Sequence, residues 1–156
     1  MEELRVPKRQ ARVELRWPGG KTQSVAVYLA EFASTHTGAQ RISELLNGRD
    51  AFVPAFDVEA EAVVFLRCTN ISVVRVQADL EPSDAEQHTL PQEHEVRITL
   101  MDGTTVSGLM SYVRPPGRER VMDFLNEESR FFPLLDKDQT LLVNKEHVAR
   151  VDVLSR

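Results

Sequence analysis

GAQRISELLN, residues 38–47, returns in altered form as GRERVMDFLN, residues 117–126. Phe52, Pro54 and Asp57 then follow the first copy at the same distances at which Phe131, Pro133 and Asp136 follow the second. Weaker matches extend the likeness on both sides: Val13, Leu15 and Trp17 correspond to Val96, Ile98 and Leu100, and Ile71, Val74 and Val76 to Val148, Val151 and Val153. Similarity at a fixed spacing is typical of a duplicated structural unit. The sequence therefore predicts two tandem units, over residues 10–76 and 93–156.

The second unit shows its expected secondary structure most clearly. Residues 96–100 alternate between apolar and polar, and the following Asp102-Gly103 favours a tight hairpin turn. Val121, Phe124 and Leu125 have the spacing of one helix face, which predicts a short helix over residues 118–126. Further strands are predicted at 105–113, 131–135, 140–143 and 148–154. The first unit has the same order, with strands at 12–17 and 22–32, a helix at 39–47, and strands around Phe52, Val63 and Val73.

The predicted fold class is mainly β with short helices (α+β): two tandem ββαβββ units, each like a small barrel, packed as a pseudodimer. A unit of roughly 60 residues is near the lower size limit for an independent core, which favours packing of one unit on the other. Short antiparallel strands also leave sheet edges that need a cover or a partner. Residues 77–92 are acidic, contain proline and have few apolar side chains, so we expect a mobile linker there, and residues 1–9 are expected to be a flexible N-terminus.

Composition narrows the classes of function. The 156-residue chain has a formal net charge of -5 and a pI near 5.4, which disfavours a protein whose main task is to bind nucleic-acid phosphates. Cys68 is the single cysteine and lies in an apolar run, so a small buried side chain is expected there instead of a disulfide or a metal ligand. Because no stretch of about 18 apolar residues occurs, we expect a soluble cytoplasmic protein without membrane contact.

The sequence contains no motif that would support catalysis. A nucleophile elbow, a phosphate loop and a dinucleotide fingerprint are all missing. The histidines are His36, His88, His94 and His147, and none has a second ligand at a metal-binding spacing; His88 and His94 are expected to be exposed spacer residues in or beside the linker. Asp136, Asp138 and Glu146 are expected to be charged turn residues. We therefore predict no enzyme activity, no catalytic residue, no metal site, no cofactor and no small-molecule substrate.

The candidate binding residues are two pairs of polar residues, and each pair has one member in each unit. Arg41 and Arg120 open the two predicted helices, and Asn47 and Asn126 close them. Asparagine is favourable at a helix C-terminus, whereas an arginine at the N-terminus opposes the helix dipole. The structural interpretation of the arginines is a salt bridge to the acid three residues later. The functional interpretation is a paired contact with an anion or a carboxylate.

Residues 96–109 carry a resemblance to a known family. Their alternating strand, the Asp102-Gly103 turn, and Val106, Gly108 and Leu109 resemble the opening of a small Sm-like or SH3-like β-barrel. The resemblance implies a small β-barrel in each unit and binding of RNA. The first unit has Val25 in place of the second glycine, and the interposed helix departs from the usual order of elements.

Three hypotheses for function follow, and the third is an enzyme site in a cleft between the two units, which would need a pocket with perturbed titratable groups. The first is a non-enzymatic binding or assembly module that contacts another protein, or further copies of itself, through unclosed strand edges. The alternative is a tandem Sm-like barrel that binds nucleic acid through a basic surface made of Lys8, Arg9, Arg12, Arg16, Arg114, Arg118 and Arg120.

Overall fold

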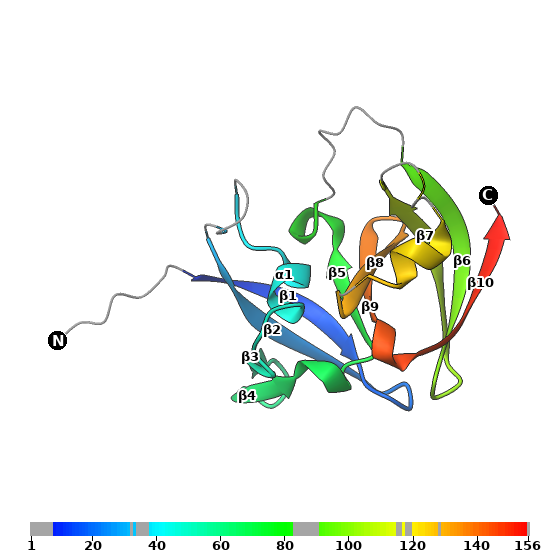
Figure 1. Cartoon of the computed structure of the whole chain (residues 1–156). Coiled ribbons are helices and arrows are strands. Elements are labelled where there is room, and N and C mark those ends of the chain that lie inside the picture. Colours follow the sequence, from blue (N-terminus) through cyan, green and yellow to red (C-terminus); the bar gives the residue numbers. More distant parts are fainter. Residues whose placement is uncertain are drawn as a thin grey trace.

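Strands make up most of the ordered structure, with two short helices between them (Figure 1). The computed structural model describes residues 8–31, 33, 38–82, 91–114, 117, 120–127 and 129–155. The first half of the chain contains β1 (Lys8–Arg16), β2 (Thr22–Ala30), α1 (Ile42–Leu46), β3 (Phe52–Asp57), β4 (Ala62–Arg67), the 3-10 turn η1 (Cys68–Asn70), β5 (Val73–Gln77) and the 3-10 turn η2 (Ala78–Leu80). The second half contains β6 (Gln92–Leu100), β7 (Thr105–Tyr112), α2 (Val121–Leu125), β8 (Phe131–Asp136), β9 (Gln139–Asn144), the 3-10 turn η3 (Lys145–His147) and β10 (Val148–Ser155). The mainly β fold with short helices that the sequence predicts is confirmed.

All ten strands belong to one antiparallel sheet, in the order β10-β6-β7-β8-β9-β5-β1-β2-β3-β4. The first half contributes β5-β1-β2-β3-β4 and the second half contributes β10-β6-β7-β8-β9, so corresponding strands stand in the same order. The two halves meet where β5 pairs with β9, and β4 and β10 are the outermost strands. Each half of the chain therefore provides one of the two edge strands of the sheet.

Apolar side chains separate into two clusters. The first cluster gathers buried residues from β1 to β5 and α1, among them Leu29, Leu46 and Cys68, which is fully buried as expected. The second gathers buried residues from β6 to β9 and α2, among them Ile98. The alternation along β1, where Ala11, Val13 and Leu15 are buried between exposed residues, is the pattern of a strand with one face on a core.

Two glycines of the second half have identifiable roles. Gly103 has a φ of +89° in the turn between β6 and β7, a conformation that favours glycine. A Cβ atom at Gly108 would lie 2.6 Å from the carbonyl oxygen of Leu135 and 2.8 Å from Cγ of Leu134. β7 pairs with β8 only at Leu109 and Leu135, next to this close approach.

Several predicted boundaries differ from the structure. Gln77 closes β5 and Gln92 opens β6, and η2 follows β5 directly, so the described ends of the predicted linker are part of the fold; residues 83–90 lie outside the described residues. Both helices are shorter than predicted, and β1 already begins at Lys8. His94 lies within β6 and is half-buried, with its ring stacked on Tyr112 at 6.0 Å, so its expected place as an exposed spacer residue is wrong.

Candidate functional site

The junction between the two halves is the pair of strands in the middle of the sheet. β5 and β9 run antiparallel, with Val74 opposite Leu142 and Val76 opposite Thr140. All four side chains are buried. Because a strand edge left unpaired exposes a row of amide and carbonyl groups, this pairing removes one edge from each half.

Side chains also cross the junction into the core of the other half. Phe131 and Leu142, from the second half, belong to the apolar cluster of the first half. Val73, from the first half, belongs to the cluster of the second. Neither cluster is therefore complete without residues from the other half.

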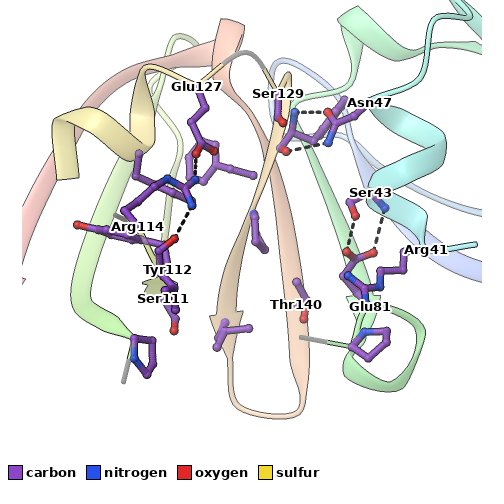
Figure 2. A pocket seen from close by; sticks show the side chains of 18 residues that line it. Arg41, Ser43, Asn47, Glu81, Ser111, Tyr112, Arg114, Glu127, Ser129 and Thr140 are labelled. Carbon is purple, nitrogen blue, oxygen red and sulfur yellow. Dashed lines mark hydrogen bonds and ion pairs between the residues drawn. The ribbon is translucent and has the colours of Figure 1, made fainter. Parts of the chain in front are cut away.

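Asn47, the C-cap of α1, bonds to the opposite half through its side chain (Figure 2). Its amide nitrogen donates to the carbonyl oxygen of Phe131 at 3.1 Å, and its amide oxygen accepts from the N–H of Phe131 at 2.7 Å. Arg130 adds a third bond, from Nη1 to the carbonyl oxygen of Leu46 at 3.2 Å. The end of α1 is thus attached to the start of β8.

Two side chains of the second half also hold the junction at this end, since Asn144 pairs with Phe131 between β8 and β9. Asn144 is fully buried, and its amide nitrogen donates to the carbonyl oxygens of Thr69 and Ile71 at 3.2 and 2.9 Å. Nε2 of His147 lies 2.7 Å from the carbonyl oxygen of Thr69, and Nδ1 lies 3.1 Å from Oγ of Ser72. Buried carbonyl groups need such partners, so both residues help to hold η1 against β9.

A polar group lies where β5 and β9 reach the surface. Nη1 of Arg75 donates to Oε1 of Gln139 at 2.7 Å and lies 3.8 Å from Asp136, while Nε lies 3.7 Å from Glu14. These side chains are partly exposed, so the ion pairs contribute little to stability. They add charge complementarity to a junction that apolar contacts hold.

Among the described residues, the outer strands β4 and β10 each pair with one neighbouring strand. Two of the side chains that face outward on β4 are apolar: Val63 is 60% exposed and Phe65 is 69% exposed. The third is Arg67, which is exposed at the end of β4 with its guanidinium 5.2 Å from the ring centroid of Phe52. On β10, Val153 and Leu154 are about half exposed. The other exposed large apolar side chains among the described residues are Phe52, which begins β3 beside β4, and Met101, Met122 and Leu135.

The predicted site residues do not form one site. Arg41 and Arg120 are the N-caps of the two helices. The backbone N–H of each arginine donates a hydrogen bond to the carboxylate three residues later, which is Glu44 or Asp123. The side chain of Arg120 also forms the predicted ion pair with Asp123, at 3.2 Å. Asn47 lies at the junction, whereas Asn126, its counterpart, is exposed. The structural interpretation therefore accounts for the described contacts of Arg120.

A groove of about 540 Å³ lies between the two halves (Figure 2). Arg41, Ser43 and Glu81 line one side, Tyr112, Arg114 and Glu127 the other, and the first residues of β8 the floor. Glu81 accepts hydrogen bonds from the N–H and the hydroxyl of Ser43, and burial raises its pKa. Arg114 forms an ion pair with Glu127 and lies 5.3 Å above the ring of Phe124. Among the described residues that line the groove, Glu81 is thus engaged with Ser43, and Arg114 with Glu127.

No protein-family model, curated protein or solved structure matches this chain. Among the described residues, no three His, Cys, Asp or Glu side chains gather into a group that could hold a metal ion. The described helices are too short to cross a membrane.

The sequence of β4 carries a signal of its own. Residues 62–66 are Ala-Val-Val-Phe-Leu, apolar at every position. A continuous apolar run is typical of a strand that is covered on both faces. In the isolated chain Leu66 is buried but Val63 and Phe65 are not, so one face of β4 lacks the cover that its sequence predicts.

Proposed function

We propose that this protein is a non-enzymatic assembly module that binds protein partners by strand addition at β4 and β10. In this proposal the chain is two tandem small-barrel-like ββαβββ units packed as a pseudodimer, and β5 and β9 close the inner edges of the two units. The outer edges stay available. Strand addition supplies main-chain hydrogen bonds for affinity and side-chain contacts for specificity.

The observation that carries the proposal is the apolar outward face of β4. Soluble proteins protect an outer strand with charges, prolines or a covering segment. Val63 and Phe65 are largely exposed, β4 contains no proline, and its one charged residue, Arg67, stands at its end. Such a face is favourable in water only when a partner covers it.

Site-specific photo-crosslinking in cells tests this function. A photoreactive phenylalanine analogue replaces Phe65 or Leu154, and the same analogue at Met101, which is 72% exposed in a turn, is the control. We expect protein crosslinks at positions 65 and 154 and few at 101. Equal yields at all three positions would show that the outer strands have no partner.

The second candidate, a tandem Sm-like barrel that binds nucleic acid, has one observation in its favour. Lys8, Arg9 and Arg12 are exposed along β1. Arg16, at the end of β1, is partly buried, and two further predicted contributors, Arg114 and Arg120, form ion pairs with Glu127 and Asp123. Nucleic acid that copurifies at low salt and leaves at high salt would favour this candidate over the assembly module.

A further inference from the structure

We propose that β4 of one chain pairs with β10 of a second copy of the same chain, in the register that β9 and β5 adopt inside each chain. This inference rests on the proposed function, because it names the partner of the same two edges. It follows from a comparison of each residue at the inner junction with its counterpart at the outer edges.

The counterparts of the side chains that cross the junction are exposed on the outer edge of the first half. Phe52 is the counterpart of Phe131, and Phe65 is the counterpart of Leu142, since Phe65 pairs with Pro54 as Leu142 pairs with Pro133. Phe131 and Leu142 are at most 1% exposed, whereas Phe52 is 50% exposed and Phe65 is 69% exposed. The first half thus presents to solvent the two apolar side chains that the second half inserts into a neighbour.

The second half has an incompletely covered core on the matching side. In the first half, Leu46 of α1 and Val76 of β5 are buried beneath the inserted residues. Their counterparts are Leu125 of α2, which is only partly buried, and Val153 of β10, which is half exposed. Phe52 and Phe65 of a second copy would cover these residues, as Phe131 and Leu142 cover the first cluster.

The two residues that bond through the Asn47 amide at the junction also have counterparts near the outer edges. Asn47 bonds to both backbone groups of Phe131, and its counterpart Asn126 stands exposed at the end of α2. The counterpart of Phe131 is Phe52, which opens β3 at the outer edge. In the proposed assembly, the amide of Asn126 bonds to the N–H and the carbonyl oxygen of Phe52 of the second copy.

The inner junction also predicts the register between chains. Val74 lies opposite Leu142 and Val76 opposite Thr140. Transfer of this register to the outer strands places Val151 opposite Phe65 and Val153 opposite Val63. A shift by one residue would turn Val63 and Phe65 to the wrong face, so the apolar pattern excludes that shift, and the inner junction supplies the register itself.

One difference makes the contact between chains weaker than the junction inside the chain. Arg75, which contacts Asp136 across the junction, is replaced at the outer edge by Asp152, and the counterpart of Asp136 is Asp57. Asp152 bonds to Arg150 instead, at 2.8 Å. The contact therefore lacks a cross-strand ion pair, and we expect association that depends on protein concentration.

The pairing is head-to-tail, because each chain offers a β4 edge at one end and a β10 edge at the other. A pair of chains keeps one free edge of each kind, so further chains add in the same way until the assembly closes or extends as a filament. A closed assembly must contain a whole number of chains and hence an even number of units.

Disulfide trapping between differently labelled chains tests the proposal. Purified chains carrying Val63→Cys are mixed with chains carrying Val153→Cys and oxidised; the native Cys68 is fully buried, so it does not compete. We expect crosslinked pairs in the mixture and none with either variant alone, because head-to-tail pairing never brings two identical positions together. A mixture of Val64→Cys with Val153→Cys, which shifts the cysteine to the opposite face of β4, should crosslink much less.

Crosslinks between two Val63→Cys chains would overturn the proposal in favour of a twofold pairing of β4 with β4. A second variant, Asn126→Ala, should lower the crosslink yield of the correct pair, and unchanged yield would remove the amide contact from the proposal. Absence of any crosslink together with a strictly monomeric chain in sedimentation would reject a second copy as the partner. If photo-crosslinks at position 65 still form in cells, the proposed function stands and the partner of β4 is a different protein. If they do not form, both the proposed function and the pairing between copies are rejected.

Discussion

The side chain of Asn47 satisfies both backbone groups of Phe131, a residue 84 positions later in the chain. β7 and β8 pair at only one position, far from Phe131, so the N–H and carbonyl oxygen of Phe131 receive no strand partner from β7. Buried backbone groups without a partner are costly, and the amide of Asn47 removes that cost. The bond therefore joins the two halves of the chain at a point where the sheet alone does not.

Replacement of Asn47 by alanine is expected to lower the free energy of unfolding by ~1 to 3 kcal/mol, the cost of leaving a buried donor and acceptor without partners. Chemical denaturation with a fluorescence readout would measure the change. Asn126→Ala is the matched control: since Asn126 is exposed in the isolated chain, its loss should change the stability of the monomer by less than about 0.5 kcal/mol. Equal losses in the two variants would show that the contribution of Asn47 is local to its helix.

Replacement of Gly108 by alanine is expected to destabilise the protein by ~1 to 3 kcal/mol, as overpacking of a close contact does. The added Cβ would meet the backbone oxygen of Leu135 at 2.6 Å, and a backbone atom in a sheet has little freedom to move. Ser107→Ala, at the exposed neighbouring position on β7, is the control and should be nearly neutral. A thermal melt compares the two variants, and a stable Gly108→Ala would show that β7 moves away from β8 without cost.

The mainly β fold with short helices could be predicted from sequence because it depends on local patterns. The apolar face of α2, the Asp102-Gly103 turn and the alternation along β6 are each set by residues close in the chain. The burial of Cys68 also follows from its apolar neighbours. These features therefore predicted the kind and the order of the elements.

The different roles of equivalent residues could not be predicted in the same way. Asn47 and Asn126 have the same local sequence context, but only Asn47 has another unit beside it in the chain. Glu81 was placed in a linker because acidic residues are mostly exposed, and its bonds to Ser43 depend on how η2 lies against α1. The sequence predicts an exposed spacer residue at His94, beside the linker, and misses its stacking because the partner, Tyr112, is on the neighbouring strand and 18 residues later in the chain. Each of these contacts joins residues that are distant in sequence.

Glu81 is expected to make stability depend on pH. Burial raises its pKa above the usual value of 4.5, so between 4.5 and the raised pKa the folded chain holds a proton that the unfolded chain has lost. The contribution of Glu81 to stability is thus greatest below pH 4.5 and decreases as the pH rises through the raised pKa. The Glu81→Gln variant keeps an oxygen that accepts a hydrogen bond from Ser43, but its side chain has no carboxyl group to titrate.

The stability of Glu81→Gln relative to the natural chain should therefore be higher at pH 7 than at pH 4, as measured by urea denaturation at both values. Glu93→Gln, at an exposed position of β6, controls for the loss of one negative charge. A difference between Glu81→Gln and the natural chain that stays constant with pH would contradict the assignment of the shift to Glu81.

Replacement of Phe65 by lysine separates the two faces of β4. Phe65 is 69% exposed, so the charge enters water and the free energy of unfolding of the monomer should change by less than about 0.5 kcal/mol. Leu66→Lys, one residue away, places the same charge in the core, where Leu66 is 4% exposed, and should cost ~3 kcal/mol or more. If β4 binds a partner, Phe65→Lys should also weaken association, measured by sedimentation, by roughly tenfold or more, as the loss of a central apolar contact does. Met101→Lys adds the same charge at another exposed apolar position, and an equal effect on association would mean that net charge, and not the face of β4, controls it.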